Sequence, residues 1–285
     1  MWEIMIVPKK IVFGLFLLIC ALHVTAMGCQ ARQEFIFGVH PYKKPYELVR
    51  MFTPLIKYLG EETGAGITFR TAENYSDAME KIASGEMDIF YLGPAPFLVL
   101  AEQYPDRFRI AATVVNKGKP MYKGVIVVRD TSAITTMADF KGKKFAFGDR
   151  HSTFSCYMPA TMLLKAEVFD SVDYSFLGSH DNVAKAVIRG FFDGGGIKYS
   201  VAKKYEGKGL KIIAESEPLH EHLIGVGPDV DDATFKKIKK ALLKVQDEKI
   251  YQSIKASLTG FTTAKMTDYE NLRGIIKEVD ARINK

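Results

Sequence analysis

The chain is poor in cysteine and lacks the short motifs that mark common enzyme classes. Its 285 residues include three cysteines. Cys20 lies inside an N-terminal export signal and Cys29 at its end, so Cys156 has no partner and a disulfide scaffold is excluded. The sequence also lacks a phosphate-binding Gly-x-x-x-x-Gly-Lys loop, a nucleophile elbow and metal-ligand spacing. We therefore predict a protein that is not an enzyme and that uses no cofactor or metal.

One enzymatic arrangement can still be drawn from the sequence. Cys156 stands four residues after Ser152, and His180 follows later in the chain, so a thiol nucleophile with a base is conceivable. A free cysteine is more often simply buried, and we expect Cys156 to be a structural residue.

Basic residues are present but form no stripe. Residues 1–28 contain Lys9, Lys10 and Glu3, so their removal turns 39 basic and 33 acidic residues into 37 and 32, a formal net charge of +5. Residues of both signs are interspersed, whereas a nucleic-acid-binding surface needs clustered positive charge. We therefore expect a solvated surface and no nucleic-acid partner.

The N-terminus has the order of regions found in a secretory signal. Lys9 and Lys10 precede the apolar run 11–22, and small residues follow. The run is shorter than the about 20 residues that span a membrane. Residues 24–26 suit ordinary signal cleavage, whereas 26–29 resemble a bacterial lipobox that has Ala in place of the usual Leu. We predict a lipoprotein signal over 1–28, with Cys29 lipidated, and keep ordinary cleavage as the alternative.

The remaining chain alternates predicted strands and helices. Apolar alternation and helical periodicity, separated by Gly and Pro turns, give a series of βαβα units, which favours a parallel sheet with helices on its faces. In the first half the predicted strands are 35–39, 67–70, 87–92 and 109–115, and the helices are 48–60, 74–85 and one opening at 93–96. In the second half the predicted strands are 122–128, one ending at 147, 174–177, 190–196, 210–214 and 223–226. The helices there are 136–140, one ending at 167, 182–189 and 198–205.

Two long helical patterns close the chain. The first starts at Asp231, and the second starts at Thr267, which forms a predicted capping box with Glu270. Because the first sheet would have an open face to cover, we expect these helices to return to it.

Residues 148–159 form the turn on which the functional interpretation depends. The turn joins a strand to a helix and is rich in hydroxyl groups. They belong to Ser152, Thr153 and Ser155. Free N–H groups, hydroxyl donors and the positive end of a helix dipole together make an anion site, although an ordinary helix cap explains any single hydroxyl equally well. Pro159 would break a helix that began at Ser152, so we expect a kink there or a helix start near Met158.

The same turn carries a resemblance to a known family. Residues 149–159 resemble the D-x-x-S-T-S-G-x-x-x-P segment of the phosphate, phosphite and phosphonate-binding proteins of ABC transporters. Further segments agree in order, at 75–82 with 85, 88 and 89, at 91–94, at 122–128 with 139–143, and at 179–181 with 186, 187, 190 and 193. The resemblance implies an α/β protein with the type II periplasmic binding protein fold, in which two Rossmann-like lobes are joined by a two-strand hinge.

The resemblance also implies lobe limits. We predict the first part of lobe 1 at 29–119, lobe 2 at 120–221, and a return to lobe 1 with the C-terminal helices at 222–285. The ligand would lie in the cleft between the lobes.

The resemblance implies a set of ligand-binding residues. Ser152 and Thr153 would donate hydroxyl and backbone N–H bonds, His180 would donate from lobe 2, and Tyr75 and Tyr122 would offer phenol groups. Each is a neutral or weakly basic donor, and many oriented dipoles can hold a compact dianion without a full counter-charge. Both tyrosines can equally be read as packing residues.

The chain departs from the family pattern at several positions. Phe154 replaces the second serine and Ser155 the glycine, so we expect Phe154 to bind through its backbone N–H and Ser155 to supply the displaced hydroxyl. Ser200 stands where aminoalkylphosphonate binders carry a carboxylate for the ligand amine, which disfavours an amine-bearing ligand. Glu221 or His222 falls near another cleft position, and its role is left open.

The function implied is that of an extracytoplasmic solute-binding component of an ABC importer. It would bind a small phosphorus oxyanion, namely phosphite, phosphate or a small alkylphosphonate, and deliver it to the permease subunits when the lobes close. We expect a monomer in the periplasm or cell envelope, anchored to a membrane if Cys29 carries lipid. The alternative is a ligand-sensing protein coupled to a membrane kinase or chemoreceptor.

Overall fold

The computed structural model describes residues 33–283. The predicted signal over 1–28 and Cys29 lie outside the described residues. Within 33–283, no helix combines the length and the apolar character that a membrane span requires.

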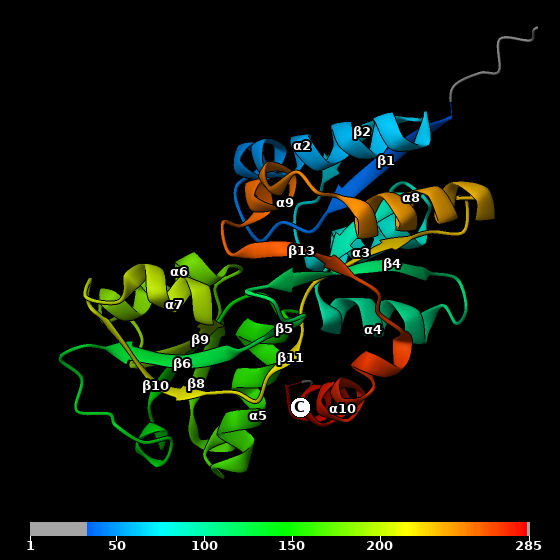
Figure 1. The fold of residues 1–285 in the computed structure, drawn as a ribbon. Coiled ribbons are helices and arrows are strands. Elements are labelled where there is room, and N and C mark those ends of the chain that lie inside the picture. Colours follow the sequence, from blue (N-terminus) through cyan, green and yellow to red (C-terminus); the bar gives the residue numbers. More distant parts are fainter. Residues whose placement is uncertain (1–32, 284–285) are drawn as a thin grey trace, which may run out of the picture. The chain divides into compact units, whose positions relative to one another are not determined.

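The first sheet has six strands in the order β13-β4-β12-β3-β1-β2 (Figure 1). Strands β1, β2 and β3 run parallel, while β12 runs antiparallel to both of its neighbours and β13 antiparallel to β4. Their bounds are β1 Glu34–Val39, β2 Gly66–Thr71, β3 Ile89–Leu92, β4 Arg109–Asn116, β12 Leu223–Val226 and β13 Leu258–Thr262. The chain therefore leaves this sheet after β4 and returns to it more than a hundred residues later.

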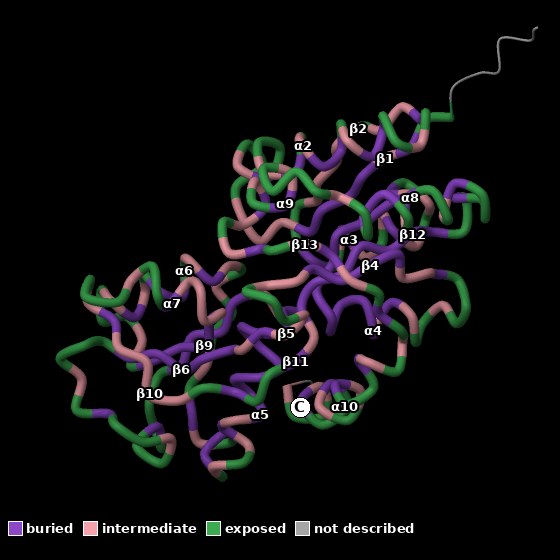
Figure 2. The backbone as a smooth tube through the Cα atoms, viewed as in Figure 1, coloured by how far each residue is buried: buried purple, intermediate pink, exposed green. Residues whose placement is uncertain are grey.

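Helices cover both faces of the first sheet. On one face α2, α8 and α9 pack together over Phe37 and Ile89, and on the other α3 and α4 pack over Phe90 and Leu92. The bounds are α2 Pro45–Thr63, α3 Tyr75–Ala83, α4 Pro94–Gln103, α8 Asp232–Lys244 and α9 Glu248–Ile254. Alternate strand residues point to opposite faces, so each strand contributes to both apolar layers. Figure 2 shows the strands buried between helices whose outer sides are exposed.

The second sheet repeats the same plan with five strands in the order β10-β6-β9-β7-β8. Strands β7, β8 and β9 are parallel, and β6 runs antiparallel to its neighbours β9 and β10. The strands are β6 Gly124–Arg129, β7 Lys144–Phe147, β8 Asp173–Phe176, β9 Gly194–Lys198 and β10 Leu210–Glu215, and the helices are α5 Met158–Lys165, α6 His180–Ile188 and α7 Tyr199–Tyr205. Short 3-10 turns lie at η1 Ala138–Phe140 and η3 Phe169–Ser171.

Two connections join the sheets. They pair with each other as a short antiparallel ribbon of β5, Met121–Tyr122, and β11, Leu219–His220. The chain passes from β4 through β5 to β6, and back from β10 through β11 to β12. Two crossing segments of this kind can act as a hinge between the two halves.

The turn before α5 shows how the chain accommodates Pro159 at the start of a helix. Residues Thr153–Tyr157 form a single π-helical turn, η2, and α5 begins at Met158 with Pro159 in its first turn. The helical backbone is continuous across this boundary, because Tyr157 has α-helical dihedral angles and the Met158 N–H donates to the Thr153 carbonyl. The α-helical part starts at Met158, as expected, and the π-helical turn before it is the kind of irregularity that accompanies a proline in a helix.

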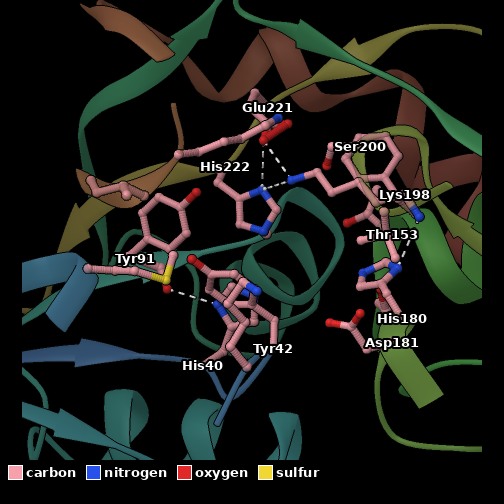
Figure 3. A pocket seen from close by; sticks show the side chains of 18 of the residues that line it. His40, Tyr42, Tyr91, Thr153, His180, Asp181, Lys198, Ser200, Glu221 and His222 are labelled. Carbon is pink, nitrogen blue, oxygen red and sulfur yellow. Dashed lines mark hydrogen bonds and ion pairs between the residues drawn. The ribbon is translucent and has the colours of Figure 1, made fainter. Parts of the chain in front are cut away.

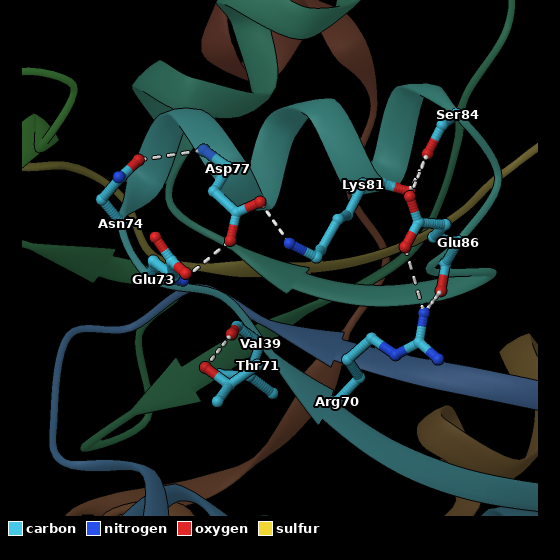
Figure 4. A network of polar contacts seen from close by, with 9 residues as sticks. All are labelled: Val39, Arg70, Thr71, Glu73, Asn74, Asp77, Lys81, Ser84 and Glu86. Carbon is cyan, nitrogen blue, oxygen red and sulfur yellow. Dashed lines mark hydrogen bonds and ion pairs between the residues drawn. The ribbon is translucent and has the colours of Figure 1, made fainter.

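Hydrogen bonds at the start of α3 hold the segment that carries Tyr75. Asn74 accepts a hydrogen bond from the N–H of Asp77 at 2.9 Å, as the sequence predicts for a helix cap (Figure 4). The Asp77 carboxylate in turn accepts the N–H of Glu73 at 2.8 Å and pairs with Lys81 one helical turn later. These contacts hold the first turn of α3, and the Tyr75 side chain is buried at its start.

The C-terminal region differs from the sequence expectation in two respects. The predicted capping box of Thr267 and Glu270 is wrong: a 3-10 turn, η4 (Met266–Tyr269), precedes α10 (Asn271–Ile283), and Asp268 accepts the N–H of Lys265 at 2.7 Å. Helices α8 and α9 do return to the first sheet, but α10 packs against α4 and α5 instead of a sheet face.

Candidate ligand-binding site

A cavity of about 170 Å³ lies between the two sheets and draws its walls from both. One side comes from residues after β1 and β3 and from α3, and the other from η2, the start of α6 and the end of β9. Carboxyl ends of parallel strands are where α/β sheets place their ligands. A cavity of about 150 Å³ admits a benzene-sized molecule, so this one has room for a small organic anion.

Two of the predicted donors meet at the start of η2. The Thr153 Oγ1 accepts the N–H of Ala95 from α4 at 2.9 Å, a bond that links the two halves and leaves the hydroxyl hydrogen able to donate. The Ser152 Oγ accepts the N–H of Ser155 at 3.2 Å and also shares a side-chain hydrogen bond with Tyr75. Ser152, Thr153 and Tyr75 all line the cavity.

The Ser155 hydroxyl points into the protein interior and away from the cavity. Its hydroxyl donates to the carbonyl of Gly196 at 2.7 Å, its side chain is fully buried, and it does not line the cavity. A Cβ added at Gly148 would lie 2.2 Å from the Ser155 Oγ, so the glycine makes room for this inward position. The structure therefore does not bring the Ser155 hydroxyl to the place where the sequence analysis expected it.

Phe154 lines the cavity, whereas Tyr122 stands behind the wall. The two rings pack edge to face with centroids 5.8 Å apart. The Tyr122 phenol is hydrogen-bonded to the Ser200 side chain, and burial raises the pKa of that phenol. Tyr122 therefore supports the residues of the wall and is not itself part of it.

His180 lies at the start of α6 and faces the cavity with a defined tautomer. Its Nδ1 accepts the N–H of Lys198 at 3.0 Å. Burial, and then the Lys198 ammonium, lowers the pKa of His180 to about 3. The ring is therefore neutral, and with Nδ1 acting as an acceptor its proton lies on Nε2, where it can be donated to an anion.

A charged group joins Lys198, on the same side as His180, to Glu221 and His222 (Figure 3). The Lys198 ammonium is 2.7 Å from Glu221 Oε1 and 3.3 Å from His222 Nδ1. Burial alone would raise the pKa of Glu221, but Lys198 and His222 outweigh it and hold that pKa well below its ordinary value. Burial, followed by Lys198, lowers the pKa of His222 to about 4, so this histidine is neutral at physiological pH.

Stacked rings form a third part of the wall. His222 stacks on Tyr91 at 5.0 Å and on His40 at 5.2 Å between centroids. His40 Nδ1 donates to the Tyr91 carbonyl at 3.0 Å, and burial, then His222, holds the pKa of His40 well below its ordinary value. These rings make a rigid, uncharged surface beside the charged group.

Lys255, just after α9, adds a second ammonium. Its Nζ lies 3.8 Å from the centre of the Tyr122 ring, is shielded from solvent and has no hydrogen-bond partner among the described residues. Burial, and then Lys198, lowers the pKa of Lys255 to about 7. In total four lysines and two carboxylates line the cavity, a formal net charge of +2. The site is thus more cationic than a set of neutral donors.

Cys156 lies within η2, and its thiol is fully buried. Burial raises the pKa of the Cys156 thiol to about 12, so a thiolate nucleophile is not available near neutral pH. Between residues 33 and 283, no group of three or more His, Cys, Asp and Glu side chains is placed to hold a metal ion.

Sequence reasoning missed several wall residues. His40 and Lys198 lie at or just beyond the ends of β1 and β9, and the rule that ligands bind at such ends could have found them. Glu221 and His222 were noted without a role, and both line the cavity. Lys255 had no local signal, because it follows a seven-residue helix that the sequence analysis did not predict.

Two curated proteins are similar to this chain in sequence. The phosphate-import protein PhnD of Mycolicibacterium smegmatis is 28% identical over 166 residues, which are 54% of this chain and 52% of that protein. A Prochlorococcus marinus protein named "Probable ABC transporter phosphite binding protein PhnD1" is 26% identical over 174 residues, 58% of each chain. The chain thus spans about half the length of the curated relatives it matches.

Solved structures share the fold. PhnD1 from Prochlorococcus marinus in complex with methylphosphonate has a TM-score of 0.77 at 20% identity, covering 89% of this chain and 99% of that one. A binding protein component of an ABC phosphonate transporter from Pseudomonas aeruginosa has a TM-score of 0.75 at 18% identity, covering 87% and 88%. The fold is therefore that of type II periplasmic binding proteins, as predicted.

A family model extends the likeness over most of the chain. Residues 37–269 match the model described as "ABC transporter, phosphonate, periplasmic substrate-binding protein". This range includes η2, His180, Lys198 and Lys255, so the whole cavity falls inside it, and the expected family is confirmed. The chain belongs to the periplasmic substrate-binding proteins of phosphonate ABC transporters.

Proposed function

We propose that the protein is the extracytoplasmic solute-binding component of an ABC importer and that it binds a small phosphorus oxyanion between its two lobes. The observation that carries the proposal is the convergence of Ser152, Thr153 and His180 on one cavity, where Thr153 and His180 each have a hydrogen to donate. The phosphoryl oxygens accept these bonds, Phe154 adds its backbone N–H, and Tyr75 faces them from α3. Phosphite, phosphate and small alkylphosphonates are the candidate ligands.

Lobe closure is the proposed signal to the permease. The bond from the Ala95 N–H to the Thr153 Oγ1 crosses between the halves, so ligand contacts to Thr153 strengthen a link that opening must break. We assign the lobes to 29–119 with 222–285, and to 120–221. Attachment of the mature chain to a membrane through Cys29 and a monomeric state complete the proposal.

The relatives' names support an oxyanion of phosphorus. One relative is named for phosphate import, and a second, PhnD1 of Prochlorococcus marinus, is named for phosphite binding and was solved with methylphosphonate. Sensing through a kinase or chemoreceptor has no comparable support. The buried, high-pKa thiol of Cys156 argues for binding without catalysis.

A matched pair of variants tests the assignment of the turn. Thr153→Val removes a hydroxyl that faces the cavity, whereas Ser155→Ala removes one that faces Gly196. We expect calorimetry with the tightest-binding of these anions to show a loss of tenfold or more for Thr153→Val, because hydrogen bonds to a charged group contribute about 1.5–3 kcal/mol. Ser155→Ala should bind within about threefold of wild type and lower only the unfolding midpoint. Equal losses in both variants would contradict the assignment.

A further inference from the structure

The cavity has a cationic end formed by Lys255 and Lys198. Lys255 and Lys198 both lie over the Tyr122 ring, with their Nζ atoms 3.8 and 4.6 Å from its centre. Both residues line the cavity. A ring face attracts cations, so Tyr122 holds the two ammonium groups in the same part of the wall.

A single carboxylate offsets these two ammonium groups. Glu221 pairs with Lys198 through Oε1, and its Oε2 is buried without a hydrogen-bond partner in the described part of the chain. His180 and His222 are neutral, as their low pKa values require. Lys255 therefore has no carboxylate of its own, and the cost of burying its charge without a partner lowers its pKa to about 7. An anionic group of the ligand is the partner that would offset it.

The cationic end is set apart from the phosphoryl donors by the length of one side chain. The backbone N–H of Lys198 donates to His180, and the ammonium at the other end of the same residue reaches Glu221. A ligand with two anionic groups can place one on the donor set of His180 and the other on the ammonium groups. The cavity of about 170 Å³ has room for both groups.

We propose that the ligand is a phosphonate that carries a second anionic group, a carboxylate, bound by Lys255 together with Lys198. The inference rests on the proposed function, because it places the phosphoryl group on Thr153 and His180. A ligand with an amine at that end is disfavoured, since its charge would face two ammonium groups.

Three ligands of similar size distinguish the possibilities by isothermal titration calorimetry. The three differ in the group at the end away from the phosphoryl group. This group is a carboxylate in phosphonoacetate, a methyl group in ethylphosphonate and an ammonium group in 2-aminoethylphosphonate. We expect phosphonoacetate to bind at least about tenfold more tightly than ethylphosphonate, as one hydrogen-bonded charge pair provides. The aminoethyl compound should bind most weakly.

Substitutions at Lys255 test whether this residue causes the preference for phosphonoacetate over ethylphosphonate. Lys255→Met should abolish the advantage of phosphonoacetate and leave ethylphosphonate within about threefold, while Lys255→Arg should retain the advantage. Lys236→Met makes the same change at an exposed position of α8 and should retain it as well. Thermal unfolding checks that each variant is folded. If Lys255→Met does not fold, the preference of the wild type for phosphonoacetate over ethylphosphonate still tests the proposal.

The contrary results are distinct. Equal affinity of the wild type for phosphonoacetate and ethylphosphonate, or equal loss of both in Lys255→Met, overturns the second anionic group and leaves the proposed oxyanion site intact. Absence of binding to every phosphorus compound overturns the inference and the proposed function together.

Discussion

At the scale of single residues, the site combines neutral donors of fixed orientation with two buried lysines. His180 is an instance of the first kind. Because its Nδ1 accepts from the Lys198 N–H, the neutral ring can offer only Nε2–H to a ligand. Because the donor is already oriented in the free protein, ligand binding loses no conformational entropy in orienting it. Preorganised donors gain affinity in this way.

Two substitutions at His180 separate its two nitrogens. His180→Gln places a donor near the Nε2 position, whereas His180→Asn keeps an acceptor near the Nδ1 position and loses the donor. We expect calorimetry with a phosphorus anion to give a loss of about tenfold or more for Asn and a smaller loss for Gln. A larger loss for Gln than for Asn would mean that His180 acts through Lys198 and not through the ligand.

Lys255 makes the stability of the ligand-free protein depend on pH. Its pKa in the folded chain is lowered to about 7 from the ordinary 10.5, so between these values the unfolded chain binds more protons than the folded one. Stability should therefore rise with pH from 7 toward 10 through this group, by at most about 1.4 kcal/mol per pH unit. Lys117 and Lys198 favour the lowered pKa, and Glu221 opposes it.

Urea unfolding at pH 7 and pH 9 measures this contribution. We expect the free energy of unfolding to rise more between the two pH values in the wild type than in Lys255→Met. Other titrating groups are shared by the two proteins and cancel in the comparison. The same pH response in both would show that Lys255 keeps an ordinary pKa.

At the scale of elements, α10 ties the two halves of the molecule together. It packs on α4 beside the first sheet and on α5 beside the second. Asp280 of α10 pairs with Arg150, in the turn before η2, at 2.9 Å, and Arg273 lies 3.7 Å from Glu102 of α4. The last helix thus contacts the segment that presents Ser152 and Thr153.

Loss of the Asp280 pair should destabilise the protein more than loss of an exposed one. Asp280 and Arg150 are both partly buried, so Asp280→Asn should cost about 1–2 kcal/mol of unfolding free energy. Asp170→Asn breaks a pair with Arg282 whose carboxylate is 70% exposed, and should cost less than about 0.5 kcal/mol. Denaturant unfolding of the two variants side by side checks this, and equal costs would contradict a structural role for the Asp280 pair.

Most helices and strands could be predicted because their periodic pattern of apolar residues extends over many positions. The α2 stripe of Leu48, Phe52 and Leu55 and the apolar strand before Gly93 are local signals that packing does not override. The segment of α9 and β13 was not predicted, because a seven-residue helix and a five-residue strand with exposed positions carry too little periodicity. Lys255 lies between them, and the packing of α9 on α2 together with the pairing of β13 with β4 brings it to the cavity.

The remaining differences in the site arise from contacts distant in sequence. The direction of the Ser155 hydroxyl depends on the carbonyl of Gly196, 41 residues away, and on the absence of a side chain at Gly148. Gly148 lies in the same turn as Ser155, but the residues around Ser155 do not reveal that its hydroxyl meets the Gly196 carbonyl. The turn itself was predicted because its hydroxyls and Pro159 are adjacent in the sequence.

At the scale of the whole molecule, two sheets of the same plan are joined by two crossing segments and enclose a cavity with an excess of positive charge. This arrangement suits an anion that is held from both lobes and released when they part. The donors of η2 and α6 suit the tetrahedral oxygens of phosphorus, and the lysines add charge.

The central claim is that this cavity binds an oxyanion of phosphorus, and isothermal titration calorimetry of ligand-stripped protein tests it most directly. Phosphite, phosphate, methylphosphonate and phosphonoacetate would be titrated, with sulfate as the tetrahedral anion that lacks phosphorus. We expect one-to-one binding of at least one phosphorus anion, more tightly than sulfate, and the loss of this binding in Thr153→Val. Failure of all four to bind, or tighter binding of sulfate than of any of them, would contradict it.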